Sequence, residues 1–199
     1  MPKTVDYKLT AGSMWGKIEV TIEGLTALLM HNPSSMNEPK AGRKQEHDSP
    51  EIEAEKGCYW SSNGKKTLIL KDTHIKGCLL NAAKAFKTGR RGPSLATLLA
   101  GQAKIMPPEI SLGTTKWEPD VQSVVIRATK GRILRGRPKI MPWKASFQIV
   151  FHSETFPDTK IIREILEHGG LFVGLLDFRP EKKGSYGQFK VTKWQEARK

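Results

Sequence analysis

A glycine-rich, basic stretch near the C-terminal end limits the choice of folds more than any other segment of the sequence. Residues 169–191 hold five of the 18 glycines and four lysines or arginines. Apolar residues recur at helical spacing just before this stretch, and Asp158 is placed to cap the start of that helix. We expect the pair Gly169-Gly170 to end the helix in a left-handed conformation. An apolar strand over 171–176 and a final strand over 188–191 should follow.

The order helix, strand, basic glycine loop and strand is the way in which a ferredoxin-like βαββαβ domain closes. The predicted fold class is therefore α+β, a ferredoxin-like antiparallel sheet with helices and one mobile insertion. Glycines let a backbone approach a phosphate chain closely and cations supply the attraction, so this stretch is also a candidate for binding nucleic acid. The alternative is a glycine-rich hairpin that only makes a tight turn.

The N-terminal half begins with apolar and polar residues that alternate between 16 and 29, a pattern that predicts a half-buried strand. The composition then changes, because residues 32–56 contain three prolines, many charges and almost no core-forming side chains. We interpret 32–56 as a mobile insertion, since its composition cannot offset the entropy lost on ordering.

A hairpin is predicted around Asn63-Gly64, between two runs with strand character. A helix should follow, with Asp72 as its cap and apolar residues along one face. Lys76 lies on the opposite face, where a cation is either simply solvated or available to a polyanion. Further expected elements are a helix over 94–103 and strands over 121–126 and 145–151.

The net charge of +13 is distributed unevenly along the 199 residues. Residues 1–57 carry seven Lys/Arg against nine Asp/Glu, which gives −2, whereas residues 58–199 carry 26 against 11, which gives +15. Because these cations cluster with glycines and aromatic residues, the asymmetry indicates a nucleic-acid partner rather than a merely solubilising surface.

The cysteines, histidines and apolar runs make several other classes of protein unexpected. Two cysteines that are 20 residues apart are too few for a disulfide scaffold or a four-cysteine zinc site, so a cytoplasmic protein is the default. The five histidines have no spacing typical of a metal site, and we expect no cofactor. No run of 18 apolar residues and no signal-peptide h-region occur, so no membrane partner is expected either.

A second basic segment, residues 127–144, holds seven cations, two glycines and Trp143. Arg135 and Arg137 would project to the same side of an extended ribbon. Cations interleaved with an aromatic ring suit a single-stranded polymer, whose phosphates pair while its bases stack; the alternative is a basic hairpin with Trp143 in the core. The full set predicted to bind nucleic acid is Lys76, Arg127, Lys130, Arg132, Arg135, Arg137, Lys139, Trp143, Lys144, Arg179, Lys182, Lys183, Gly184 and Tyr186.

Two segments resemble parts of a known superfamily. Residues 70–80, Leu-Lys-Asp-Thr-His-Ile-Lys-Gly-Cys-Leu-Leu, resemble the strand–turn–helix of the RAMP superfamily, and residues 169–189 resemble its C-terminal glycine loop. RAMP proteins are RNA-recognition-motif-like proteins of CRISPR systems, and their Cas-seven-type backbone subunits polymerise along the guide RNA. The resemblance implies one RAMP-like domain over residues 1–199, in which the insertion at 32–56 acts as a thumb that folds over the strand.

The chain is also similar, nearly end to end, to uncharacterised phage-encoded proteins. Those proteins share Leu-Leu-Met-His near the start, an Arg-x-Arg-Pro block followed by Trp, and a Gly-Asp-x-Arg-Pro ending followed by Gly-x-Phe. The matching segments here are 28–31, 135–138 with Trp143, and 176–180 with 187–189. Leu176 stands where those phage proteins tend to have Gly.

The predicted function is that of a non-enzymatic subunit that binds single-stranded RNA or DNA, above all guide RNA. It would multimerise along the strand as a homo-oligomer or filament and assemble with other CRISPR-type subunits in antiviral defence. The alternatives are a phage single-stranded DNA-binding or annealing protein, a RAMP-type RNA endonuclease, and a protein-only mimic or inhibitor of a CRISPR backbone. An endonuclease would need a general base, for which His31 and His74 are candidates, while Asp48 is a candidate for cleaving target RNA. We expect no catalytic residue, since no phosphate-binding loop, nucleophile elbow or carboxylate pair occurs.

Overall fold

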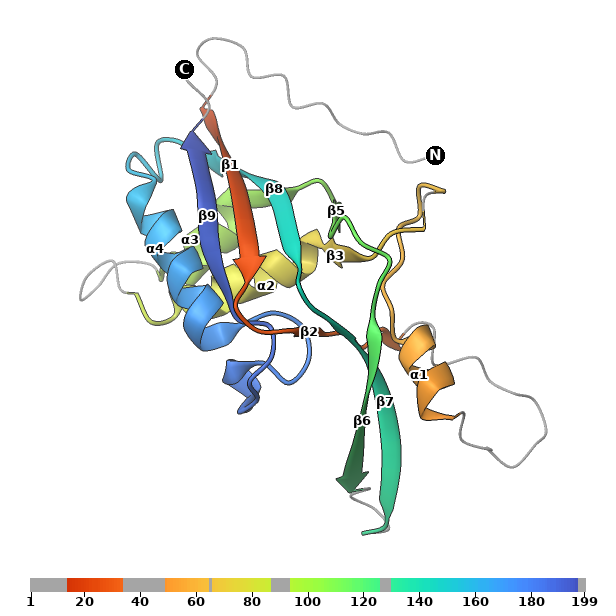
Figure 1. The fold of residues 1–199 in the computed structure, drawn as a ribbon. Coiled ribbons are helices and arrows are strands. Elements are labelled where there is room, and N and C mark those ends of the chain that lie inside the picture. Colours follow the sequence, from red (N-terminus) through yellow and green to blue (C-terminus); the bar gives the residue numbers. More distant parts are fainter. Residues whose placement is uncertain (1–13, 34–48, 65, 87–93, 126–129, 197–199) are drawn as a thin grey trace, which may run out of the picture.

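The central sheet of the protein has four antiparallel strands in the spatial order β4-β8-β1-β9 (Figure 1). The computed structural model describes residues 14–33, 49–64, 66–86, 94–125 and 130–196. The two middle strands, β1 and β8, are in register from Trp15 opposite His152 to Glu23 opposite Lys144. The four strands span Trp15–Gly24 (β1), Ala103–Met106 (β4), Lys144–His152 (β8) and Phe189–Glu196 (β9).

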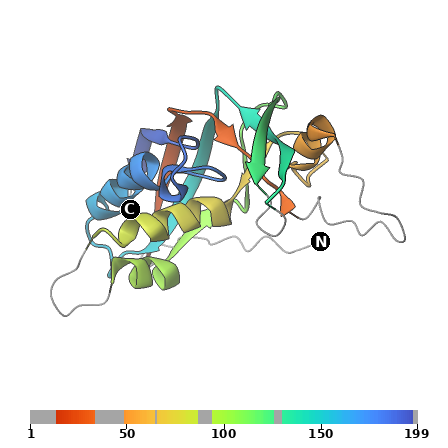
Figure 2. The same cartoon turned by 90° about the horizontal axis from the view of Figure 1, so that it is seen from below.

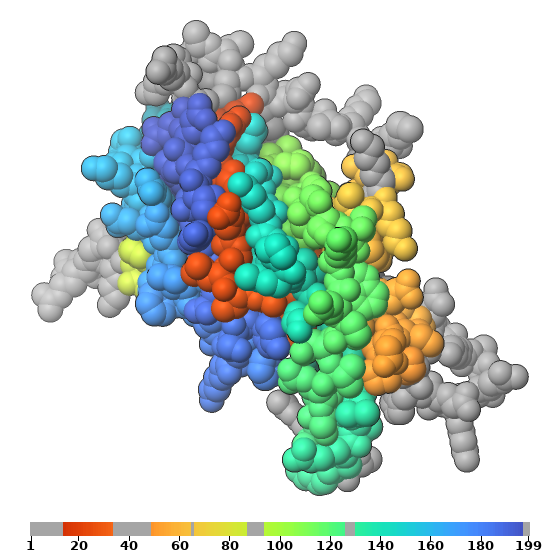
Figure 3. All heavy atoms as spheres, in the orientation of Figure 1, coloured from red at the N-terminus to blue at the C-terminus, as the bar shows by residue number. Residues whose placement is uncertain are grey.

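Helices cover one face of this sheet, and the described part of the chain places no helix on the other face (Figures 2 and 3). The alternation predicted for β1 is confirmed, because Ile18, Val20 and Ile22 are buried toward the helices. They join one hydrophobic core with Leu79 of α2 and Ile165 of α4.

The α+β class is therefore confirmed, and no helix among the described residues is long and apolar enough to cross a membrane. The helices span Asp72–Ala83 (α2), Leu95–Gln102 (α3) and Lys160–His168 (α4).

A second, three-stranded sheet in the order β2-β7-β6 forms an arm that extends away from the helices (Figure 1). Helix α1 packs beside β7, where a Cβ on Gly136 would lie 1.7 Å from the carbonyl oxygen of Pro50. We call strands β6 and β7 together the β6–β7 arm. The remaining elements span Leu28–Leu29 (β2), Pro50–Lys56 (α1), Ile69–Lys71 (β3), Glu109–Ser111 (β5), Glu118–Val125 (β6) and Arg132–Ile140 (β7).

The strand predicted over 171–176 is wrong. Helix α4 continues into a turn of π-helix, η2, over Gly169–Val173, and Gly169 keeps the right-handed conformation of the helix. The first residue with a positive φ after α4 and η2 is Gly174, with φ +75°. The π-helical turn fits because Gly170 has no Cβ, which would lie 2.3 Å from the carbonyl oxygen of Phe189 at the start of β9.

The start of α2 also differs from the prediction. Asp72 is the first helical residue, and the N-cap is Lys71, whose backbone N–H donates to Nδ1 of His74 over 3.2 Å. The His74 ring thus takes the part of the N3 side chain in a capping box, because it accepts the backbone N–H of the N-cap residue.

The predicted hairpin around Asn63-Gly64 and the predicted insertion at 32–56 are each described only in part. Gly64 turns the chain with φ +82°, but pairing around it is limited to one bridge between Trp60 and Leu68. Residues 34–48 of the insertion lie outside the described residues. The last part of the insertion is the ordered helix α1.

Candidate nucleic-acid interface

The glycine loop, which we define as residues 174–188, closes on itself between η2 and β9. The N–H of Leu175 donates to the carbonyl of Gly187 over 2.9 Å, and that of Tyr186 donates to the carbonyl of Phe178 over 3.1 Å. Left-handed backbone is costly for residues with a side chain, so these bonds hold the loop in a conformation that its sequence alone does not favour. The left-handed residues are Gly174, Leu176, Phe178, Lys183 and Gly187.

Two positions show how closely this loop is packed. A Cβ on Gly184 would lie 1.7 Å from the carbonyl oxygen of Phe178, so only glycine fits there without a shift of the backbone. Leu176 adopts φ +61°, a left-handed conformation that costs more for a residue with a side chain than for glycine.

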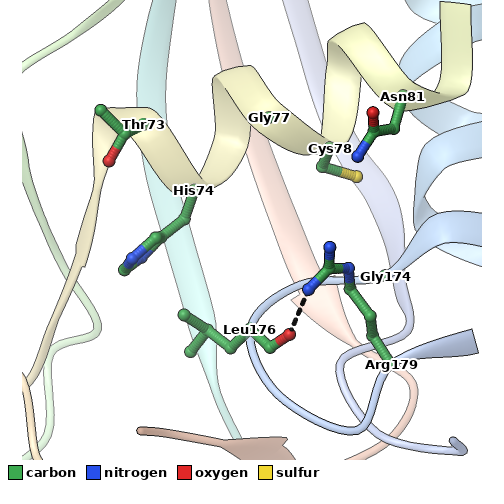
Figure 4. Close-up of a pocket in the computed structure, with 8 residues that line it drawn as sticks. All are labelled: Thr73, His74, Gly77, Cys78, Asn81, Gly174, Leu176 and Arg179. Atoms are coloured by element: carbon green, nitrogen blue, oxygen red, sulfur yellow. Dashed lines mark hydrogen bonds between the residues drawn. The ribbon is translucent and has the colours of Figure 1, made fainter. Parts of the chain in front are cut away.

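A cavity of about 180 Å³ lies between α2 and the glycine loop (Figure 4). The α2 side presents Thr73, Gly77 and Asn81, which are four residues apart and therefore form one stripe along the helix. No atom lies within 4 Å of the position that a Cβ on Gly77 would take, so the stripe is open at its centre. The lining residues are Thr73, His74, Gly77, Cys78, Asn81, Gly174, Leu176 and Arg179.

Arg179 is the cation of this cavity, which it lines opposite Thr73 and His74 of α2. Its Nη1 donates to the carbonyl of Leu176 over 2.8 Å, and its Nη2 pairs with Glu181 over 2.7 Å. The guanidinium is thus oriented by the loop and partly neutralised by it. Lys182 and Lys183 follow in the same loop and are exposed.

The two titratable groups at the cavity are uncharged at neutral pH. Burial, aided by the charge of Lys71, lowers the pKa of His74 to about 4. Burial likewise raises the pKa of the Cys78 thiol to about 12, so the thiol stays protonated. The cavity therefore presents neutral hydrogen-bonding groups beside a cation, which suits a sugar–phosphate chain.

The β6–β7 arm contacts the glycine loop through two polar pairs. Arg137 of β7 pairs with Asp177 over 2.9 Å, and the Tyr186 hydroxyl donates to Asp120 of β6 over 3.4 Å. The two basic, glycine-bearing segments thus adjoin at Arg137. Contact of these residues with nucleic acid stays a prediction.

Other cations of β7 also face carboxylates. Nη1 of Arg135 is 2.6 Å from Glu53 of α1, and the same carboxylate accepts the backbone N–H of Gly136 over 3.1 Å. Lys139 lies 3.7 Å from Glu118. To form an ion pair with a phosphate, these cations would exchange the carboxylate that they face for it.

The far end of the arm carries the cations that are most accessible. Lys130 and Arg132 are exposed there, beside the start of β7. Arg127, also predicted to bind, lies outside the described residues. Cations therefore occur at three places, which are the cavity with Arg179, the junction with the glycine loop at Arg137, and the end of the arm with Lys130 and Arg132.

Two of the predicted residues are engaged inside the fold, and their assignment is corrected. Lys76 donates to the backbone carbonyls of Leu99 and Ala103 at the end of α3, and burial lowers its pKa, so it caps a helix. Trp143 is 4% exposed, and its Nε1 donates to the carbonyl of Thr26 over 2.8 Å, so no base can stack on it.

Lys144 lies away from the cavity, and its contact with nucleic acid stays a prediction. It follows Trp143 on β8, where Ala145 is buried toward the helices and Lys144 therefore belongs to the uncovered face. There it pairs with Glu23 over 3.1 Å. It is separated from the cavity by the sheet.

Two of the three residues considered for catalysis are among the described residues. His31 is exposed and lies after β2, His74 lines the cavity, and Asp48 lies outside the described residues. Among the described residues no three His, Cys, Asp or Glu side chains are grouped as a metal site would require.

The sequence reasoning missed two sets of residues. The first is the stripe of Thr73, Gly77 and Asn81, which the four-residue spacing in a predicted helix could have revealed. The second is the carboxylates of Glu53 and Asp177, which pair with arginines far away in the chain and leave no local pattern.

The chain matches no protein-family model and no curated protein sequence. Among solved structures it is similar to a chain in the cryo-EM structure of the type III-B Cmr-beta bound to cognate target RNA. The TM-score is 0.60 and the sequence identity is 16%, over 92% of this chain. The match spans 61% of the length of that chain. At 16% identity, the likeness is one of fold.

Proposed function

We propose that this chain binds single-stranded nucleic acid, RNA above all, as a non-enzymatic RAMP-type subunit of the Cas-seven kind. The observation that carries the proposal is the junction between the glycine loop and the β6–β7 arm at Arg137 and Asp177, 2.9 Å apart. Through this junction a strand lying on Arg179 at the cavity could continue along the cations of β7. Phosphates would be bound without reference to sequence.

The strand order supports the ferredoxin-like part of the proposal. With β1, α2, β4, β8, α4 and β9 taken in chain order, the elements read βαββαβ, and the sheet order is fourth, first, third, second strand. The fold likeness to a chain of the RNA-bound Cmr-beta structure points to the same superfamily as the RAMP resemblance of residues 70–80 and 169–189.

The thumb-like role falls, in this proposal, to α1 together with the β6–β7 arm. The Glu53 carboxylate ties α1 to both Arg135 and Gly136, so helix and arm would move as one body. An arm that extends from a single domain could reach along the strand to the next subunit, and other CRISPR-type subunits could cap such a filament.

A protein-only role is the second candidate. The observation that favours it is that Arg135, Arg137 and Arg179 each already face a carboxylate. A protein that mimics a backbone subunit without binding RNA would need its cations neutralised in this way.

The deciding experiment is a titration of the purified, nucleic-acid-free protein into labelled single-stranded RNA, single-stranded DNA and duplex RNA of equal length. Preferential binding to single strands, with several protein copies per long strand and no cleavage in Mg²⁺ or Mn²⁺, is the expected result. Cleavage would establish the endonuclease instead. Indifference to all three polymers would leave the protein-only role.

A further inference from the structure

Three aromatic rings lie in a row on the surface beside the end of α2. The ring centroids of Phe86 and His168 are 5.4 Å apart, and those of His168 and Phe172 are 4.7 Å apart with the last two rings tilted by 39°. Phe172 is 61% exposed, although a phenylalanine gains most when it is buried. We call these three side chains the aromatic row.

The row stands on a rigid element. η2 is held against α2, since a Cβ on Gly169 would lie 3.0 Å from Sγ of Cys78. Gln188 also fixes η2, because its Nε2 donates to the carbonyl of Leu171 over 2.9 Å. The exposure of Phe172 is therefore a feature of the packed fold.

The aromatic row lies at the far end of the stripe that lines the cavity. The stripe of Thr73, Gly77 and Asn81 leads to Lys84, whose Nζ donates to Oδ1 of Asn81 over 2.8 Å, and Phe86 follows two residues later. Helix α2, with 12 residues, is about 18 Å long, a distance that a few nucleotides of an extended strand can span. An exposed ammonium group thus lies between the cavity and the rings.

The cation beside the aromatic row is Lys84, which is exposed and lies two residues before Phe86. An exposed ring near an ammonium group fits a nucleotide, whose base stacks while its phosphate is attracted by the cation.

We infer that Phe172, backed by His168, is a stacking platform for a base of the single strand that leaves the cavity along α2. The inference rests on the proposed function and adds to it a base contact outside the glycine loop and the arm. Because every base has a flat π-face, such a contact strengthens binding without selecting a sequence.

The test compares Phe172→Ala with Leu171→Ala, a neighbouring exposed side chain on the same turn, in anisotropy titrations with single-stranded RNA. Phe172→Ala is expected to weaken binding roughly 5- to 100-fold, with Leu171→Ala close to wild type and Phe172→Trp restoring affinity. The slope of log K against log salt should stay the same in all variants, because no phosphate contact is removed. RNA that contains abasic positions should bind wild type more weakly, and the Phe172→Ala variant should be insensitive to this change.

Three results would overturn the platform. One is wild-type affinity of Phe172→Ala in a protein that does bind RNA. Another is an equal loss in Phe172→Ala and Leu171→Ala. The third is loss of self-association in Phe172→Ala, measured by sedimentation without RNA, with unchanged affinity for RNA; the row would then contact a second copy. If wild type binds no single strand at all, the proposed function has failed, and the platform fails with it.

Discussion

Replacing Arg137 by Gln or Asp177 by Asn breaks the same ion pair from its two ends, which separates a structural role of Arg137 from a role in binding. The pair joins β7 to the glycine loop over 2.9 Å, with side chains 25% and 34% exposed. A partly exposed pair contributes about 0.5–1 kcal/mol to stability, so the free energy of unfolding should fall by a similar small amount in both variants.

The affinity for single-stranded RNA should instead move in opposite directions. Arg137→Gln removes a phosphate contact of about 1.5–3 kcal/mol, which screening by salt reduces to about 1 kcal/mol, or roughly fivefold in Kd. Asp177→Asn removes the carboxylate that competes with phosphate for the same guanidinium, so Kd should be unchanged or a few-fold lower.

The assay is fluorescence anisotropy with a labelled RNA of about 30 nucleotides, together with urea unfolding of each variant. Arg137→Gln should also reduce the steepness of the salt dependence by about 0.7 in log K against log salt. Lys193→Gln is the matched control, because it removes a lysine that pairs with Glu19 over 3.3 Å on the uncovered face of the sheet. The reasoning is refuted if both variants at the junction lose affinity equally, or if the control loses as much as Arg137→Gln.

Four further substitutions probe the packing around the interface. Lys76→Met should lower the free energy of unfolding, measured in urea, by about 1–3 kcal/mol, because the carbonyls at the end of α3 lose their donor. The affinity for RNA, measured by anisotropy, should be unchanged. Trp143→Phe should cost a similar amount, also without a change in affinity, since the carbonyl of Thr26 loses the indole N–H. Gly187→Ala should lower both Tm and affinity, because alanine is strained at φ +73° in the glycine loop. Because of His74, the free energy of unfolding should fall as the pH falls from about 6.5 to 4. The unfolded chain binds a proton at the ordinary pKa of the imidazole, whereas the folded protein binds it only near pH 4. In His74→Asn, the free energy of unfolding measured in urea should change less over this pH range.

The main elements of the fold were predictable because their patterns are local. Alternation defines β1 and β8, and the apolar face of α2 is visible from Ile75 to Ala83. The run from 171 to 176 was assigned to a strand because a short apolar run without periodicity does not distinguish a strand from a helix. The π-helical turn is accompanied by close packing of Gly170 on Phe189, a contact between separate segments that no local pattern reveals.

The candidate site was predictable only in part, because its geometry depends on contacts between distant segments. The indole N–H of Trp143 reaches a carbonyl 117 residues away, which turns an apparent stacking residue into a core residue. Arg135 meets Glu53 across 82 residues, and no local charge pattern indicates that the strand cations have carboxylate partners. Composition identified the two basic segments, whereas tertiary packing decides which of their side chains share a surface.

The most direct test of the central claim is the salt dependence of binding to single-stranded RNA of unrelated sequences. With four to six phosphate contacts per subunit, log K should fall against log salt with a slope of roughly −3 to −4, and unrelated sequences should give nearly the same line. A flat response between about 50 and 200 mM salt, or a strong preference for one sequence, would contradict the account.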